Sequence, residues 1–181
     1  MKILFTYCMI LAFFFSFSYC VEGMELKQDE QNKRIIGVFN RAIELNENYK
    51  HEFTKKEQSN QRGNRSELEK YYEEVVLISL KECIIKLSSI NDEELAISLF
   101  HLILSFSNSA DENLSDSLAQ LFVKNNELIE KIFNKFNQRQ KKQLYEVLNI
   151  GWQNYIFNEK MPIKKIKYLQ KKINELETNA H

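Results

Sequence analysis

The histidines are the first residues to consider for catalysis, because imidazole is both a general base and a common metal ligand. His101 has Ser98 three residues before it and Ser105 four residues after it, so a helix would place the three on one face. A Ser–His pair also needs an orienting acid and a cleft, and the flanking sequence offers neither. We therefore expect a buried His101 that is hydrogen-bonded to a neighbouring serine or carbonyl. An enzyme of unfamiliar type centred on His101 stays an alternative.

Metal and cofactor sites need residue patterns that this sequence does not contain. Zinc needs three or four converging Cys, His or carboxylate ligands, and neither an H-E-x-x-H motif nor a pair of C-x-x-C motifs occurs. Loops that cradle phosphate need clustered glycines, and the four glycines of this chain are isolated from one another. The sequence therefore predicts no catalytic residue, no metal site and no cofactor.

The first 20 residues form an apolar segment with a single charge, Lys2. A short positive start, an apolar run of about 15 residues and small residues near a cleavage point are typical of a secretory signal peptide. We expect cleavage before Tyr19 or after Cys20, and an uncleaved membrane anchor and an acylated Cys20 stay open as alternatives. The sequence thus predicts an exported protein, in the periplasm or secreted.

Cys83 is the one cysteine that survives either cleavage of residues 1–20. Cleavage after Cys20 leaves Cys83 alone, so an internal disulfide framework is excluded for that processed form. Cys83 shares a helical stripe with Val76, Leu80 and Leu87, so we expect it to be buried as a small apolar residue.

Composition points to an all-α fold. The 25 Lys and Arg balance the 25 Asp and Glu, which argues against a nucleic-acid-binding protein because the global basic field is missing. Four glycines and one proline in 181 residues are too few for a fold rich in hairpins and turns. We expect one domain, either an antiparallel helical bundle or a short HEAT-like array of helical hairpins, with six to seven helices after the signal segment. The expected parts are residues 1–20 as the signal, 21–65 as a long helix with a flexible polar connection, and 66–181 as the helical body.

Capping residues and apolar spacing predict where these helices lie. Ser66 and Glu69 form a capping-box pattern, and Asn91 precedes three acids that suit the positive end of a helix dipole. The expected helices cover about 25–57, 66–89, 91–106, two short segments that are separated at Asn125-Asn126, 138–160 and a last helix from Pro162 to about 177.

The helix expected at 138–160 has more apolar residues than one neighbour can cover. Leu144, Leu148, Trp152 and Tyr155 form one stripe, and a second stripe consists of Val147, Ile150 and Phe157. We expect the last helix to cover the second stripe. The alternative is a partner groove on this helix with Trp152 and Tyr155 as its anchors, because such aromatics dominate binding hot spots. Gly151 would allow a neighbouring helix to approach closely.

The last helix carries an apolar seam and a basic face. The seam residues Ile166, Leu169, Ile173 and Leu176 are expected to pack on the helix at 138–160. The lysines that we expect to face a partner are Lys164, Lys165, Lys171 and Lys172. This arrangement favours a non-enzymatic exported protein that acts through protein–protein interaction, with an acidic partner as one option. Two alternatives remain, an immunity or inhibitor protein against an exported toxin, and a protein that associates with a membrane surface through its N-terminal segment or this basic helix.

Overall fold

The computed structural model of this chain describes residues 27–51, 65–107 and 112–180. The chain divides after Arg34 into two compact units, which are treated separately. In the first unit, residues 27–34 are helical and carry an exposed ion pair between Lys33 and Asp29. The signal segment predicted at 1–20 and the side chain of Ser66, which would make the first capping box, lie outside the described part of the chain.

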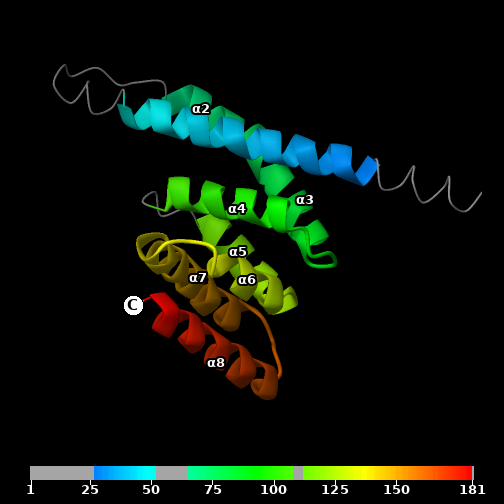
Figure 1. Cartoon of the computed structure of the whole chain (residues 1–181), viewed down its shortest axis with the longest axis vertical. Coiled ribbons are helices and arrows are strands. Elements are labelled where there is room, and N and C mark those ends of the chain that lie inside the picture. The colour runs from blue at the N-terminus through cyan, green and yellow to red at the C-terminus, as the bar shows by residue number, and fades with distance from the viewer. Residues whose placement is uncertain (1–26, 52–64, 108–111, 181) are drawn as a thin grey trace, which may run out of the picture. The chain divides into compact units, whose positions relative to one another are not determined.

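Every element of the described residues is helical, which confirms the all-α fold class (Figure 1). Residues 35–51 are helical, and they are followed by α2 (Arg65–Tyr71), a π-helical turn η1 (Tyr72–Val76), α3 (Leu77–Leu87), α4 (Glu93–Phe106), α5 (Glu112–Lys124), α6 (Asn126–Phe133), α7 (Gln138–Asn158) and α8 (Ile163–Ala180). The π-helical turn was not predicted, and nothing in the residue pattern indicates it.

Asparagine side chains define two of the helix boundaries. Asn125 accepts a hydrogen bond from the Leu128 amide at the start of α6, which confirms the predicted break between α5 and α6. The same side chain donates to the Leu87 carbonyl at 2.8 Å and so ties the end of α3 to the start of α6. Asn137 and Gln140 form a capping box at the start of α7.

The predicted cap at Asn91 is wrong by one residue. Asp92 caps α4, because its extended backbone lets the carboxylate accept from the Leu95 amide at 2.9 Å. The Asn91 side chain instead accepts a hydrogen bond from Asn125, 34 residues along the chain. A tertiary contact therefore occupies the side chain that the local pattern assigned to capping.

The core is continuous across the second unit. The helix at 35–51 contributes Ile35, Phe39 and Ala42, and its Asn46 side chain donates to the Ser105 carbonyl at 2.8 Å. The apolar residues spaced along α4, α5 and α6, and Phe136 just after α6, are buried, and they include Leu95, Leu99, Leu102, Phe106, Leu118, Leu121, Phe122, Leu128, Ile129, Ile132, Phe133 and Phe136.

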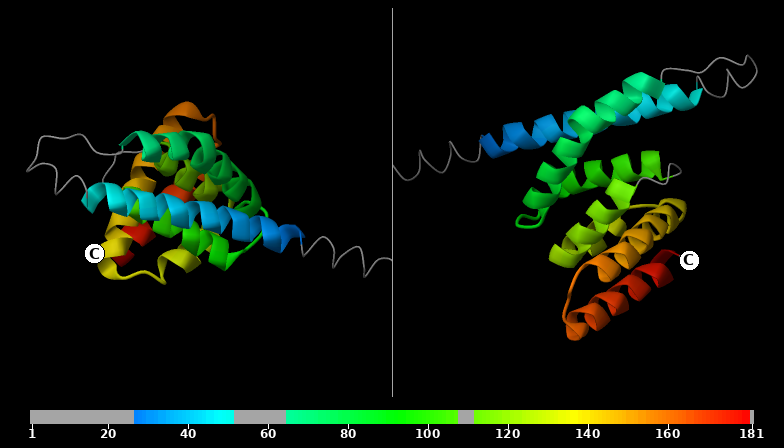
Figure 2. Two further views of the ribbon diagram at one scale, coloured as in Figure 1. Left: turned by 90° about the horizontal axis from the view of Figure 1, so that it is seen from above. Right: turned by 180° about the vertical axis from the view of Figure 1, so that it is seen from behind.

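The last two helices lie side by side, and α7 also packs against α5 (Figures 1 and 2). An added Cβ at Gly151 would lie only 1.9 Å from the Ser115 carbonyl oxygen, so the close approach predicted at this glycine is confirmed. Leu169, Ile173 and Leu176 are buried in the contact of α8 with the rest of the unit, and Ile166 packs at its edge.

Candidate interaction surface at the last two helices

Trp152 does not lie on a partner surface in this structure. Its side chain is fully buried, and the indole N–H donates to Gln170 Oε1 of α8 at 2.8 Å. Gln170 is in turn held by Asn174, because its amide nitrogen donates to the Asn174 side-chain oxygen at 3.0 Å. The prediction of Trp152 as a partner anchor is therefore corrected, because the side chain is buried inside the chain and α8 supplies the hydrogen-bond acceptor that a buried indole needs.

Tyr155 is also mostly withdrawn from solvent. It is half-buried and packs at the edge of the core. Burial raises the pKa of its phenol above the usual range, and the nearby Glu159 carboxylate adds to this rise. Of the two predicted aromatic anchors, Trp152 is thus bonded to α8 and Tyr155 is partly covered by the core, so neither is a fully open side chain.

The second apolar stripe of α7 is the one that remains open. We expected α8 to cover it, but Ile150 is 56% exposed and Phe157 is 90% exposed. The prediction that α8 covers the second stripe is therefore wrong for Ile150 and Phe157. The apolar content of the two stripes is similar, so the sequence pattern alone did not indicate which stripe faces α8.

The four lysines predicted as partner contacts divide into two pairs. Lys172 lies between two carboxylates, with its Nζ 3.1 Å from Glu130 Oε2 and 3.4 Å from Glu175 Oε2. The hydrogen bond to Glu130 raises the pKa of the Lys172 ammonium group. Lys171 is well exposed and lies 3.9 Å from Glu175 Oε1. Lys172 is thus a contact between α8 and α6, which corrects its assignment to an outward basic face.

Lys164 and Lys165 have the environment that was predicted for them. Both are exposed in the first turn of α8, and Lys167 follows in the next turn. Among the described residues, none of these three lysines forms an ion pair or a side-chain hydrogen bond. We call Lys164, Lys165 and Lys167 the lysine patch. Ile163, which is 72% exposed, lies beside them and was not singled out from the sequence.

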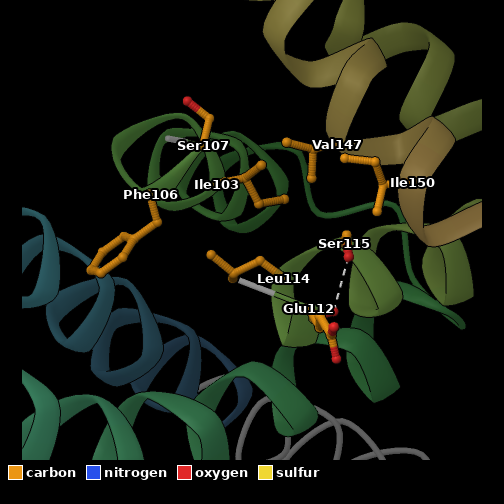
Figure 3. Close-up of a pocket in the computed structure, with 8 residues that line it drawn as sticks. All are labelled: Ile103, Phe106, Ser107, Glu112, Leu114, Ser115, Val147 and Ile150. Carbon is orange, nitrogen blue, oxygen red and sulfur yellow. Dashed lines mark hydrogen bonds between the residues drawn. The ribbon is translucent and has the colours of Figure 1, made fainter. Parts of the chain in front are cut away.

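A partly open cavity of about 180 Å³ lies beside the open stripe of α7. It is lined by Ile103, Phe106 and Ser107 of α4 and the turn after it, Glu112, Leu114 and Ser115 of α5, and Val147 and Ile150 of α7 (Figure 3). Figure 3 shows Val147 and Ile150 across from Ile103, with the Phe106 ring pointing away from them. The cavity thus has three helices around it and an apolar interior.

His101 is exposed, so the expectation of a buried histidine is wrong. Its ring contacts the edge of the Phe136 ring, with 5.3 Å between the ring centroids. Ser105 is engaged by Asn46, and in the described ranges no hydrogen bond joins His101 to Ser98 or Ser105. The three residues follow one another on α4, but they do not form a hydrogen-bonded unit.

Cys83 is buried, as predicted, and forms no disulfide with another described residue. Burial raises the pKa of its thiol above the usual range, and the nearby Asp92 carboxylate adds to this rise. A thiol in this environment is a poor nucleophile, because the thiolate is the reactive form.

Neither a metal-binding cluster nor a membrane-crossing helix is present in the described part of the chain. No three His, Cys, Asp or Glu side chains converge on a possible ion position within the described part of the chain. Of the helices in residues 27–51, 65–107 and 112–180, none has the length and apolar character that a bilayer crossing requires.

No protein-family model, curated protein or solved structure matches this chain. The function is therefore inferred from the surfaces and contacts of this chain alone.

Proposed function

We propose that the chain is an exported, non-enzymatic, all-helical protein that acts by binding another protein, and that the lysine patch contacts an acidic surface on that partner. The observation that carries the proposal is the difference between the lysines of α8. Lys171 and Lys172 have carboxylates of this chain nearby, whereas the lysine patch has none within 4.0 Å among the described residues.

Helix stability does not account for the lysine patch. The N-terminal end of a helix carries a partial positive charge, so each exposed cation there costs about 0.3–1 kcal/mol. The first turn of α8 contains no acidic residue to offset this cost. An acidic partner would supply the missing negative charge, and long-range attraction would accelerate association.

Export and the finer architecture belong to the same proposal. The pattern of residues 1–20 supports cleavage of a signal peptide, which would deliver the helical body to the periplasm or the exterior. Contacts between successive helices, α3 with α4, α5 with α6 and α7 with α8, support an antiparallel bundle or a short HEAT-like array.

Capture from the exported fraction of the producing cells tests the proposal. Tagged wild-type protein should retain an acidic protein at low salt and release it at about 0.5 M salt, because salt screens exposed charges. A variant with Lys164→Gln and Lys165→Gln should lose most of this capture. Its free energy of unfolding should stay within about 0.5 kcal/mol of wild type, since exposed charges contribute little to stability.

A matched control separates the patch from total charge. Lys81→Gln with Lys124→Gln removes the same number of exposed positive charges from α3 and α5, and it should capture the acidic protein as wild type does. Equal loss in both double variants, or capture that is indifferent to both, would contradict a role for the lysine patch.

Binding to an anionic membrane surface is a second candidate, because exposed Ile163 adjoins the lysine patch. The apolar seam of α8 is buried, however, so α8 does not present the broad apolar face of an interfacial helix. Sedimentation with vesicles of phosphatidylcholine and 30% phosphatidylglycerol, lost in the Lys164→Gln, Lys165→Gln variant, would favour the membrane over the protein partner.

A further inference from the structure

The open stripe of α7 consists of Val147, Ile150 and Phe157. Ile150 and Phe157 are seven residues apart, which is two helical turns, so both point to the same side of α7, about 10.5 Å apart along its axis. Val147 is half-buried, Ile150 is 56% exposed and Phe157 is 90% exposed. A large aromatic side chain with so little cover is the most prominent apolar feature among the described residues of this helix.

The cavity beside Val147 and Ile150 suits an apolar group. Its two serine hydroxyls already donate to backbone carbonyls, Ser107 to Leu104 at 2.9 Å and Ser115 to Glu112 at 3.0 Å. They therefore do not require a polar ligand. An apolar cavity of about 150 Å³ holds a benzene molecule, so the volume of about 180 Å³ found here is sufficient for one phenyl ring.

We propose that a second copy of this chain covers the open stripe, with Phe157 of each copy seated in the cavity beside Ile150 of the other. The stripe contains both a protruding ring and a cavity that fits a ring, so it is complementary to itself. Self-complementarity of one patch is the requirement for a two-fold symmetric dimer. This proposal goes beyond the acidic partner, because it concerns α7 and needs no other protein.

The spacing along α7 determines the arrangement of the dimer. In an antiparallel pair of α7 helices, Ile150 lies opposite Phe157 of the partner when the two-fold axis passes between residues 153 and 154. Gln153 is exposed at this position, and Asn154 donates to Asp116 Oδ1 at 3.1 Å within its own copy. Polar side chains thus lie at the axis, with one ring and one cavity on either side.

Charge supports the same arrangement. Glu146 lies one turn before Ile150, and Lys160 lies three residues after Phe157. Both side chains are exposed, and neither forms an ion pair with another described residue. The antiparallel arrangement brings Glu146 of each copy toward Lys160 of the other, so opposite charges face each other on both sides of the axis.

Sedimentation equilibrium tests the dimer, with the protein purified from the cells that produce it and with whatever processing those cells carry out. The wild type should have twice the mass of one chain at about 100 µM, a concentration at which weak symmetric dimers form. Phe157→Ser should raise the dimer dissociation constant at least about tenfold, because each dimer loses two buried aromatic contacts. Ile85→Ser is the matched control, since Ile85 of α3 is 68% exposed and lies outside the stripe.

Charge exchange then tests the antiparallel arrangement. Glu146→Lys and Lys160→Glu should each weaken the dimer several-fold, and the two together should restore it. Circular dichroism should be the same for all variants, because these side chains are exposed. A monomeric wild type at about 100 µM, or a Phe157→Ser variant that dimerises as well as wild type, would overturn the proposal. A double charge exchange without recovery would overturn the antiparallel arrangement. Since only the purified chain is weighed, none of these results depends on the acidic partner.

Discussion

Replacing Gly151 with alanine should destabilise the protein even though alanine is the better helix former. In an open helix the change would stabilise by up to about 1 kcal/mol, because glycine has more backbone entropy to lose on folding. At this position a Cβ would lie 1.9 Å from the Ser115 carbonyl oxygen and 2.4 Å from its carbonyl carbon. Both atoms belong to the backbone of α5, so no side-chain rotation can relieve the overlap.

The size of the effect follows from the movement that is required. The Ser115 oxygen would have to retreat from 1.9 Å to at least about 3.0 Å, which separates α5 from α7 along their shared contact. Overpacking of a dense interior costs about 1–3 kcal/mol, and this overlap justifies the upper value. After the gain in helix propensity, we expect a net loss of about 2 kcal/mol. With a urea dependence of about 2 kcal/mol per molar, the midpoint should fall by about 1 M.

Gly37 supplies the matched control for this experiment. It is exposed in the helix at 35–51, and nothing lies within 4 Å of an added Cβ. Gly37→Ala should therefore raise the free energy of unfolding by about 0.5–1 kcal/mol, which urea denaturation followed by circular dichroism will measure. If Gly151→Ala is as stable as wild type, or gains stability as Gly37→Ala does, the close packing of α5 and α7 is refuted.

Three further predictions concern pH, thiol reactivity and the α8 seam. Glu93 forms ion pairs with Lys131 and Lys135, and these lower the pKa of its carboxyl group from 4.5 to about 2. The pairs therefore stabilise the protein fully above about pH 4.5, and this contribution is lost as the pH falls toward 2. Glu93→Gln should flatten the dependence of the free energy of unfolding on pH in this range, and an unchanged dependence would contradict the pairing. Cys83 should react with a thiol reagent only as fast as the protein unfolds, because its thiol is buried and the pKa of the thiol is raised. Rapid modification under native conditions would count against the burial of Cys83. Ile173→Asp should lower the free energy of unfolding by about 3 kcal/mol or more, because the change introduces a carboxylate into a fully buried position. A urea midpoint equal to that of wild type would disprove the packing of α8.

Local signals in the sequence were sufficient for the helices and for most of the core. Apolar spacing and the Asn125-Asn126 break predicted α5 and α6 correctly, and the glycine at 151 indicated a close helix contact. These features depend on residues that are near in sequence, or on the absence of a side chain. The cap at Asp92 was missed because the competing residue, Asn91, is claimed by Asn125 through a contact between distant segments.

The candidate surface was harder to predict, because it depends on which face of each helix is covered. The two stripes of α7 have similar apolar content. The hydrogen-bond acceptor for the buried Trp152 indole is Gln170, a polar residue on a different helix. Lys172 looked equivalent to Lys164 in the sequence, but only Lys172 faces Glu130 of α6. Neither distinction is encoded in periodicity. Both require the relative placement of α6, α7 and α8.

The measurement that tests the proposed function most directly is the salt dependence of the association rate with the captured acidic protein. For wild type the rate constant should fall steeply as ionic strength rises from about 0.02 M to 0.3 M, because the Debye length shortens over this range. The Lys164→Gln, Lys165→Gln variant should associate more slowly at low salt and show a shallower slope, while the Lys81→Gln, Lys124→Gln control keeps the wild-type slope. The same slope in all three proteins would contradict the proposal that the lysine patch of α8 recognises an acidic partner.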